Sequence, residues 1–453
     1  MEGKKIRIGG AAGFEEDIFE PAVTLAESGN IQYLCFENLA ERTLAFAQNR
    51  KKEDPTKGYN PLTEARMRAV LPACVKNNVK IISNFGAANP LGAADVVRKV
   101  IQEMGFSGLT IATVLGDDVR YLLTPDLKIW ETKATLDKLY GDVVSANAYI
   151  GAEPIVAALE AGADIVITGR TADPSLFLAP IMYEFGWGKD EWNLMGAGTV
   201  CGHLLECGAY VTGGYFCDPG YTEDVPNIAD IGYPIAEVYE DGEAIITKVP
   251  GTGGLVSSTT CKAQLVYEIH DPANYITPDV VADFSNVKFE QVGKDQVKVS
   301  GGKGFERSST LKVSVGIMEG YIAEGELGWA GPGSYEKAKI TAEAIQKKLE
   351  PIRNEIEELR VDFIGLNSIF GPVAPKPESP PNEIRLRIAG RSKNEAVARK
   401  ILYAFGFLMA APLGAGGGKT NLRPVLGIYS TLIPREKVAT QVITDRIDIY
   451  EVK

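Results

Sequence analysis

Three residues on one predicted helix have the types and spacing that acid–base chemistry needs. His203, Glu206 and Cys207 stand at positions i, i+3 and i+4, which share one face of a helix. A carboxylate beside an imidazole fixes the tautomer of the ring and raises its basicity, so His203 and Glu206 are predicted to be catalytic. The same face could supply two metal ligands, with Asp173 as a third. The alternative is a core histidine bonded to Glu206, and the second histidine, His270, is expected to be structural.

A second candidate feature follows the predicted strand at 165–168. Arg170 could bind a carboxylate or a phosphate through two parallel hydrogen bonds, so we predict that it binds substrate. The alternative for Arg170 is a structural ion pair. Asp173 is predicted to be a third catalytic residue, and its alternative is a cap on the helix that begins near Pro174.

Polar and small residues in further loops are predicted to bind substrate. Gly10, Asn84 and Asn147 follow predicted strands, and the carboxyl ends of parallel strands form the ligand crevice of open sheets. Gly254 and Ser257 precede a predicted helix, whose free amides could bind an anion. An ordinary flexible loop is the alternative at these last two positions.

Two glycine runs do not have the spacing of nucleotide-binding loops. In the run at 414–420, a nucleoside-triphosphate loop would need glycine where Leu413 stands. A glycine nest for an anion, or a flexible turn, remains open for that run. The run at 9–13 lacks the G-x-G-x-x-G register of dinucleotide-binding folds.

The composition restricts the class of protein. The chain has 59 acidic and 47 basic residues among 453, a formal charge of −12, so we expect neither nucleic acid nor a membrane surface as a partner. A local positive pocket could still bind a small anionic substrate. No run reaches the ~20 apolar residues of a membrane span, and the first ten residues show no signal-peptide pattern. We therefore expect a cytoplasmic protein with six reduced cysteines.

The order of predicted elements is typical of an α/β fold. In residues 1–214, apolar strands alternate with helical patterns, which predicts a parallel α/β domain. Residues 215–305 are predicted to form a β-rich module with one helix. Residues 306–453 show the order β-α-β-β-α-β of a ferredoxin-like α+β domain. The predicted parallel strands are 6–9, 33–36, 79–83, 109–114, 143–146 and 165–168, and the last strand of the C-terminal domain is predicted at 438–444.

Several motifs together resemble the acyclic terpene utilisation AtuA family. They are Ile6–Phe14, Asn84–Pro90, Ile167–Asp173, Ala197–Ala209, Tyr267–Pro272, Tyr275–Asp279 and Tyr429–Arg435, and they span nearly the whole chain. The resemblance implies a role in bacterial degradation of acyclic terpenes, whose intermediates pass through carboxylation, hydration and cleavage of branched acyl-CoA. It supplies no family-wide catalytic residues. Some members of the family have an additional small C-terminal domain, which implies a possible small partner subunit here.

These observations lead to one expected function and one alternative. We expect an enzyme of carboxylic acid or acyl-CoA catabolism, of hydratase or lyase type, that acts on a small or branched anionic substrate. The alternative is a non-catalytic subunit that binds an acyl-CoA or organic acid and supports a partner enzyme. We expect a homo-oligomer. The sequence leaves the cofactor, the metal and the identity of the substrate open.

Overall fold

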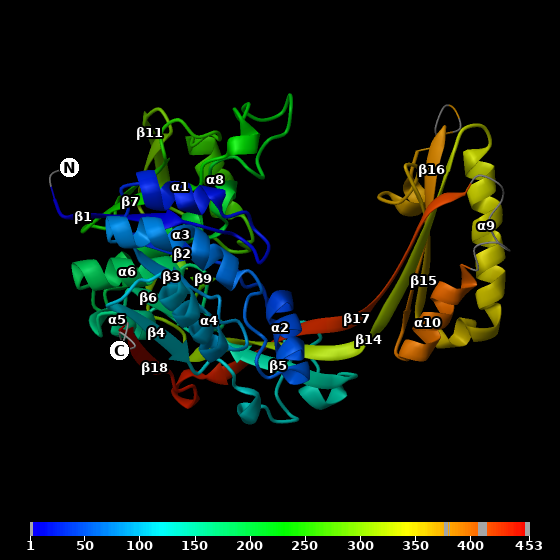
Figure 1. The fold of residues 1–453 in the computed structure, drawn as a ribbon, viewed down its shortest axis with the longest axis horizontal. Coiled ribbons are helices and arrows are strands. Elements are labelled where there is room, and N and C mark those ends of the chain that lie inside the picture. Colours follow the sequence, from blue (N-terminus) through cyan, green and yellow to red (C-terminus); the bar gives the residue numbers. More distant parts are fainter. Residues whose placement is uncertain (1–2, 376–378, 380, 406–414, 449–453) are drawn as a thin grey trace. The chain divides into compact units, whose positions relative to one another are not determined.

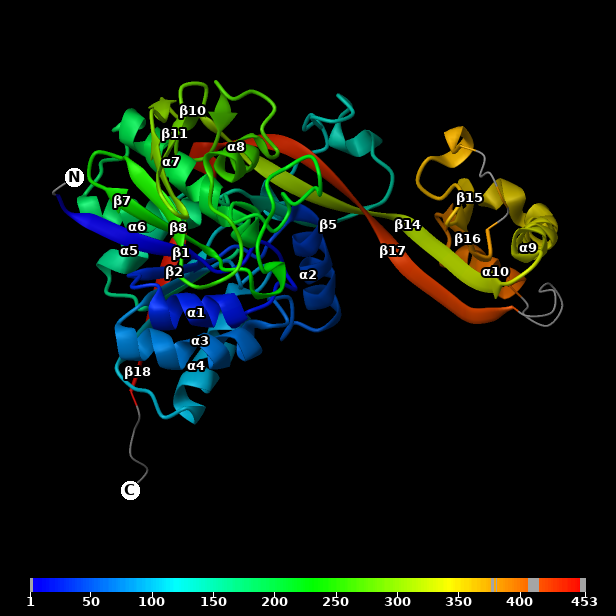
Figure 2. The same ribbon diagram turned by 90° about the horizontal axis from the view of Figure 1, so that it is seen from above.

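The computed structural model describes residues 3–375, 379, 381–405 and 415–448 (Figures 1 and 2). The chain divides into two compact units. The first comprises Met1–Lys138, Val144–Gly316 and Ile428–Lys453, and the second comprises Leu139–Val143 and Ile317–Gly427. The fold is mixed α/β, with helices against several sheets.

The first unit is built on a ten-stranded mixed sheet of order β11-β12-β8-β7-β1-β2-β3-β6-β4-β18. Its centre is five parallel strands with short, apolar and mostly buried sequences, as expected for strands covered on both faces. These strands are β1 (Lys5–Gly10), β2 (Tyr33–Phe36), β3 (Lys80–Ser83), β6 (Ile165–Thr168) and β4 (Leu109–Leu115).

Helices cover both faces of this parallel centre. Successive side chains of a strand point to opposite faces, so strands that are apolar at every position need cover on both sides. Leu34 and Phe36 pack in one apolar core, formed with three helices that lie together in Figure 2: α1 (Glu20–Ser28), α3 (Thr63–Asn77) and α4 (Pro90–Glu103). Tyr33 and Cys35 pack in the core of the other face. The helices there are α5 (Glu153–Glu160), α6 (Ser175–Phe185) and α7 (Trp192–Glu206).

Antiparallel strands extend the sheet at both edges. Beyond β1 follow β7 (Pro234–Tyr239), β8 (Ala244–Lys248), β12 (Gln296–Ser300) and β11 (Lys288–Gly293). Four strands of the predicted β-rich module thus continue the large sheet. The rest of the module forms a separate three-stranded sheet and one helix. These are β9 (Tyr275–Ile276), β10 (Val281–Asp283), β13 (Lys303–Phe305) and α8 (Ser258–Val266). The division of the chain into three folding domains stays a prediction.

Two strand predictions are wrong in their sheet assignment. The strand predicted at 143–146 exists as β5 (Asp142–Ala148), but it pairs with β14 (Thr310–Ala330) and not with the parallel strands. The strand predicted at 438–444 exists as β18 (Gln441–Ile447), but it pairs antiparallel with β4 in the large sheet. Apolar patterning marks a strand without identifying its neighbour, so both errors concern pairing.

The second unit has a sheet of strand order β15-β16-β14-β17. Along the chain the elements are β14, α9 (Ser334–Leu349), β15 (Glu358–Ile364), β16 (Glu383–Ser392), α10 (Glu395–Ala404) and β17 (Gly416–Pro434). The fourth strand is therefore β17, whose first residues belong to the glycine run at 414–420. Gly414 and the preceding Leu413 lie outside the described residues. The side chains that form this unit's core include Leu327, Ile345, Leu386 and Ile401.

At one position of the parallel sheet, two neighbouring strands are followed by helices on opposite faces. β3 leads to α4 on one face, whereas its neighbour β6 leads to α6 on the other face. Open α/β sheets bind ligands beside the carboxyl ends of such a pair, because the two loops diverge there. Asn84 follows β3 and Arg170 follows β6, so both lie at this position. Every helix among the described residues is too short or too polar to span a lipid bilayer.

Candidate functional site

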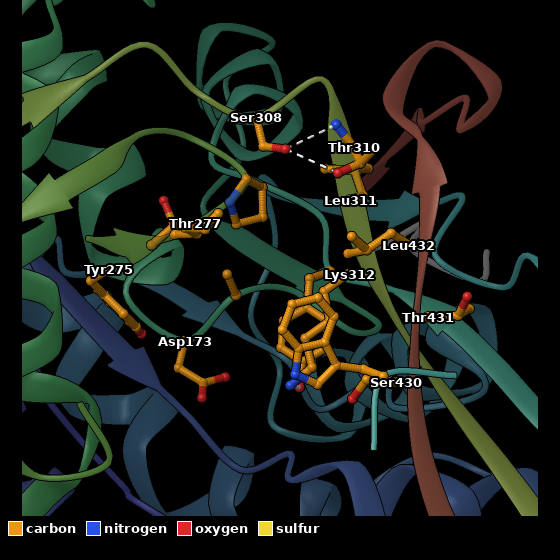
Figure 3. Close-up of a pocket in the computed structure, with 15 residues that line it drawn as sticks. Asp173, Tyr275, Thr277, Ser308, Thr310, Leu311, Lys312, Ser430, Thr431 and Leu432 are labelled. Atoms are coloured by element: carbon orange, nitrogen blue, oxygen red, sulfur yellow. Dashed lines mark hydrogen bonds between the residues drawn. The ribbon is translucent and has the colours of Figure 1, made fainter. Parts of the chain in front are cut away.

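A cavity of about 430 Å³ opens beside the loop that follows β6 (Figure 3). This volume lies within the range of ~300–1,000 Å³ that is typical of small-molecule sites. Its described lining is largely apolar and aromatic, with several hydroxyl groups and two charged side chains, Asp173 and Lys312. The apolar and aromatic residues are Ala172, Ile276, Pro278, Leu311, Leu432, Trp130, Tyr149 and Tyr275; the hydroxyl residues are Thr277, Ser308, Thr310, Ser430 and Thr431.

Asp173 is the carboxylate of this lining, and Arg170 holds it in place. The guanidinium Nη2 of Arg170 donates to Asp173 Oδ1, and the two residues form an i, i+3 ion pair. The Arg170 side chain is buried, whereas that of Asp173 is 37% exposed where it faces the cavity. Burial raises the pKa of Asp173, and Arg170 opposes this effect. A carboxyl group with a raised pKa and access to a cavity is suited to proton transfer.

The predicted helix cap is not the main contact of Asp173. The helix α6 begins at Ser175 with Pro174 as its N-cap, which makes no side-chain capping bond. Asp173 instead turns its side chain to Arg170 and to the cavity. Asp173 therefore makes no capping bond to this helix, and its catalytic role stays a prediction.

Arg170 itself makes only internal contacts. Its Nε donates to the Thr171 carbonyl at 3.1 Å, and its Nη1 donates to the Leu39 carbonyl. The guanidinium carbon lies 4.4 Å from the ring centroid of Tyr149. Arg170 therefore orients Asp173 and packs behind Tyr149, and it is not among the residues that line the cavity.

A network of amides and carboxylates fixes the two loops at the ends of β3 and β6. Asn147 Nδ2 and the Arg170 backbone N–H both donate to Asp117 Oδ2, each at 2.8 Å. Asn84 Nδ2 donates to Glu37 Oε1 at 2.8 Å, and the same oxygen accepts from the Leu39 N–H at 2.8 Å. Since the Leu39 carbonyl holds Arg170, this chain of bonds runs to Asp173. Both asparagines are buried within this network and not exposed to the cavity.

The carboxylic acids of this network have raised pKa values. Burial raises the pKa of Glu37 to about 8, with Asp173 adding to the rise and Arg170 opposing it. Burial also raises the pKa of Asp117 to about 6, against the hydrogen bonds from Arg170 and Asn147. The loops that hold Asp173 therefore contain groups that bind protons near neutral pH.

Tyr149 joins Arg170 to the second charged residue of the lining. The Lys312 ammonium lies 4.7 Å from the Tyr149 ring centroid and 3.4 Å from its hydroxyl. The Tyr149 hydroxyl donates to Glu41 Oε1, and Lys312 Nζ donates to the same oxygen at 3.1 Å. Glu41 is the first residue of α2 (Glu41–Glu53). Burial alone would raise the pKa of Glu41, but Arg170, Lys312 and Tyr149 together lower it to about 2.

The predicted pair of His203 and Glu206 forms near the end of α7. His203 Nδ1 lies 2.8 Å from Glu206 Oε1, and His203 Nε2 lies 3.2 Å from the Leu265 carbonyl oxygen. The His203 side chain is 3% exposed, and its ring packs against Tyr275, with 5.6 Å between the centroids. Tyr275 lines the cavity, so the pair lies behind that ring.

The remaining predicted binding residues lie elsewhere in the first unit. A Cβ at Gly10 would stand 2.6 Å from the Leu205 carbonyl oxygen, so this glycine allows β1 to pack against α7. Gly254 has a φ of +90°, and a Cβ there would stand 2.7 Å from the Thr212 carbonyl oxygen. Ser257 caps α8 by accepting from the Thr260 N–H at 3.2 Å. None of these three is among the described residues that line the cavity.

The sequence prediction missed most of the cavity wall. Trp130, Lys312 and Ser430 come from segments far apart in the chain, and their types have no spacing that marks a site. One signal was available, because the motifs Tyr275–Asp279 and Tyr429–Arg435 both contribute to the wall. Among the described residues, no group of three histidine, cysteine, aspartate or glutamate side chains is arranged to hold a metal ion.

Comparison with known proteins identifies the family. No curated protein matches the chain. The crystal structure of protein SO0527 from Shewanella oneidensis is similar to a part of it, with a TM-score of 0.17, 11% identity, and coverage of 24% of this chain and 97% of that chain. The model of the acyclic terpene utilisation family protein AtuA matches residues 6–444. The motifs from Ile6–Phe14 to Tyr429–Arg435 lie within this match, and the chain belongs to the AtuA family.

Proposed function

We propose that the protein is an enzyme that acts on a branched carboxylic acid, or on its acyl-CoA thioester, in a reaction of hydratase or lyase type. Membership of the AtuA family implies a role in acyclic terpene utilisation. Acyclic terpenes have branched, apolar carbon chains. The largely apolar cavity supports such a substrate, because apolar walls bind the chain and a few polar groups orient it.

The proposal depends on the position of the Asp173 carboxyl group in the wall of the cavity. Asp173 is the one carboxylate among the described residues that line the cavity, and burial raises its pKa. In a hydration, the ionised carboxylate would take a proton from water while the water oxygen bonds to one carbon of a C=C bond. The same carboxyl group would then return the proton to the neighbouring carbon. A dehydrating lyase would follow these steps in reverse.

The other residues of the site would position this carboxyl group. Arg170 would hold Asp173, with Asn84 and Asn147 fixing the loops behind it through Glu37 and Asp117. His203 packs against Tyr275, and neither His203 nor Glu206 is among the described residues that line the cavity. Their predicted catalytic role stays a prediction. The ferredoxin-like interpretation of the second unit rests on its β-α-β-β-α-β order. The small partner subunit rests on the additional C-terminal domain of some family members.

Turnover and binding by the full chain test the proposal together. The substrates would be methyl-branched 2-enoyl-CoA thioesters of acyclic terpenoid skeleton and their free acids. Asp173→Asn should lower turnover by ~10²–10⁴-fold, the usual effect of losing an acid–base group, while affinity changes little. Asp118→Asn is the matched control, because Asp118 follows β4 but pairs with Arg120 at the surface. Binding without turnover by the natural chain would instead favour the non-catalytic subunit.

A further inference from the structure

We propose that Lys312 is the anion-binding residue of the cavity, and that the substrate carries a free carboxylate beside its branched apolar chain. This inference rests on the proposed function, since it concerns the same cavity. It assigns the positive charge of the site to a lysine on β14, in place of the arginine that the sequence predicted.

Arg170 is not available to bind an anion. Each of its three guanidinium nitrogens donates to a protein acceptor: Nε to the Thr171 carbonyl, Nη1 to the Leu39 carbonyl and Nη2 to Asp173. The side chain is 1% exposed and lies behind Tyr149. Its burial therefore keeps the guanidinium from a ligand in the cavity.

Lys312 has the accessibility that Arg170 lacks. Its side chain lines the cavity and is 45% exposed (Figure 3). An ammonium has three N–H donors, and the described acceptors are Glu41 Oε1 at 3.1 Å and the Tyr149 hydroxyl at 3.4 Å. The third donor is therefore free for a ligand oxygen.

The ion pair of Lys312 with Glu41 does not prevent this role. Lys312 can keep this ion pair when a ligand binds, because its side chain is 45% exposed and offers a further N–H to the cavity. The Tyr149 ring centroid, 4.7 Å from the ammonium, and the Tyr149 hydroxyl, 3.4 Å from it, also help to hold it in position. The site thus offers a positioned ammonium with one N–H left for a ligand oxygen.

The surroundings of Lys312 indicate the chemical class of the ligand. Leu311 and Leu432 supply an apolar wall, and the hydroxyl residues Thr310 and Thr431 lie in the same lining. Lys312 is the one positively charged side chain in the described lining, so a ligand carboxylate would bind there and its apolar chain would lie along the rest of the cavity. A carboxylate with a branched hydrocarbon chain fits both requirements.

Calorimetric titration of the full chain tests this at neutral pH with two probes. Citronellic acid has a branched acyclic chain with a carboxylate, and its primary amide has the same shape without the charge. We expect the acid to bind about tenfold tighter than the amide. Lys312→Met should weaken binding of the acid by ~10–100-fold, the range for a hydrogen bond to a charged group, and binding of the amide by less than ~3-fold.

Two further variants control the experiment. Lys312→Arg keeps the charge and should keep most of the preference for the acid, which also guards against a folding defect of Lys312→Met. Lys133→Met removes a lysine whose ammonium lies 4.2 Å from the ring centroid of Trp130, a residue of the same lining, and should leave both affinities unchanged.

The outcomes separate this inference from the proposed function. Equal affinity for acid and amide, or equal losses in Lys312→Met, would overturn the role of Lys312 while turnover of thioesters would still support the enzyme. Turnover of thioesters without binding of either probe would overturn it as well. Binding of the acid that depends on Lys312, in a chain without turnover, would support the subsite and count against the enzyme.

Discussion

His203 Nδ1 lies 2.8 Å from Glu206 Oε1, and the opposite ring nitrogen lies 3.2 Å from the Leu265 carbonyl oxygen. A carbonyl oxygen can only accept, so Nε2 bears a proton. Burial lowers the pKa of His203 to about 4 and raises the pKa of Glu206 well above its ordinary value. Within the described residues, the buried Glu206 Oε2 has no hydrogen-bond partner, which would be costly for an ionised carboxylate. We infer a neutral pair in which protonated Glu206 donates to Nδ1.

The neutral pair predicts the pH dependence of stability. Between about pH 4.5 and 6.5, the folded pair holds its proton on Glu206 and the unfolded chain holds one on His203, so the contribution of this pair to the free energy of unfolding is flat. Above pH 6.5 the unfolded chain loses its proton first. The contribution of the pair should then fall by ~1.4 kcal/mol per pH unit until Glu206 ionises in the folded protein. Denaturant unfolding across this pH range measures the effect.

Glu206→Gln isolates this contribution, because its amide N–H can still donate to Nδ1. In the variant, the contribution of His203 should rise up to about pH 6.5 and then stay flat, so the stability of the variant relative to the natural protein should increase with pH. Glu290→Gln, at an exposed position of β11, should follow the natural curve. Parallel curves for the natural protein and Glu206→Gln would show that Glu206 is ionised in the folded protein.

Local patterns in the sequence were sufficient to locate the parallel strands but not to order the whole sheet. Apolar runs that end in small or polar residues marked β1, β2, β3, β4 and β6. The pairing of β18 with β4 joins residues more than 300 positions apart, and no local pattern encodes such a contact. The same limit explains why β5 was placed in the parallel sheet although it pairs with β14.

In the site, too, contacts set by local spacing could be predicted from the sequence, whereas contacts between distant segments could not. The i, i+3 spacing correctly brought His203 and Glu206 together, and the strand-end rule brought Asn84 to the position where β3 and β6 diverge. The acceptors around Arg170 could not be predicted, because one of them, the Leu39 carbonyl, belongs to a loop that is distant in the sequence. Lys312 was missed for the same reason, since β14 meets the loop after β6 only in the folded chain.

Gly10→Ala should destabilise the protein without a direct effect on ligand binding. The added Cβ would stand 2.6 Å from the Leu205 backbone oxygen, which cannot move aside cheaply. Overpacking of this kind costs ~1–3 kcal/mol. Gly188→Ala is the control, because the nearest atom to its Cβ would be 3.5 Å away. Thermal unfolding and ligand titration on the same preparations measure both properties, and weaker binding by fully folded Gly10→Ala would point to a ligand role.

Arg170→Met should be among the most destabilising substitutions of the site. It removes the partner of Asp173 and leaves the Leu39 and Thr171 carbonyls without this donor. Each buried acceptor left without its hydrogen bond costs ~1–3 kcal/mol. Arg98→Met is the matched control, because Arg98 is 35% exposed and pairs with Asp445 at 2.7 Å, an exposed pair worth ~0–1 kcal/mol. Similar midpoints for the two variants in denaturant would contradict the buried role of Arg170.

Glu41→Gln should shift the pH profile of the proposed reaction. Glu41 carries a negative charge above about pH 2 and raises the pKa of Asp173 after the larger effect of burial. If Asp173 acts as the base, kcat/KM falls when the pH drops below the pKa of Asp173, which lies above the ordinary value of 3.8. Removing the charge of Glu41 favours ionised Asp173, so this acid limb should move to lower pH by roughly 0.5–1 unit.

The control for this shift is Glu53→Gln, an exposed carboxylate at the other end of the same helix, α2. It should leave the acid limb in place, since it lies more than three helical turns from Glu41. The glutamine at position 41 can still accept from the Tyr149 hydroxyl and from Lys312, so both residues keep their contact with this position. An acid limb that stays at the same pH in Glu41→Gln, with the fold intact, would mean that the titrating group is not Asp173.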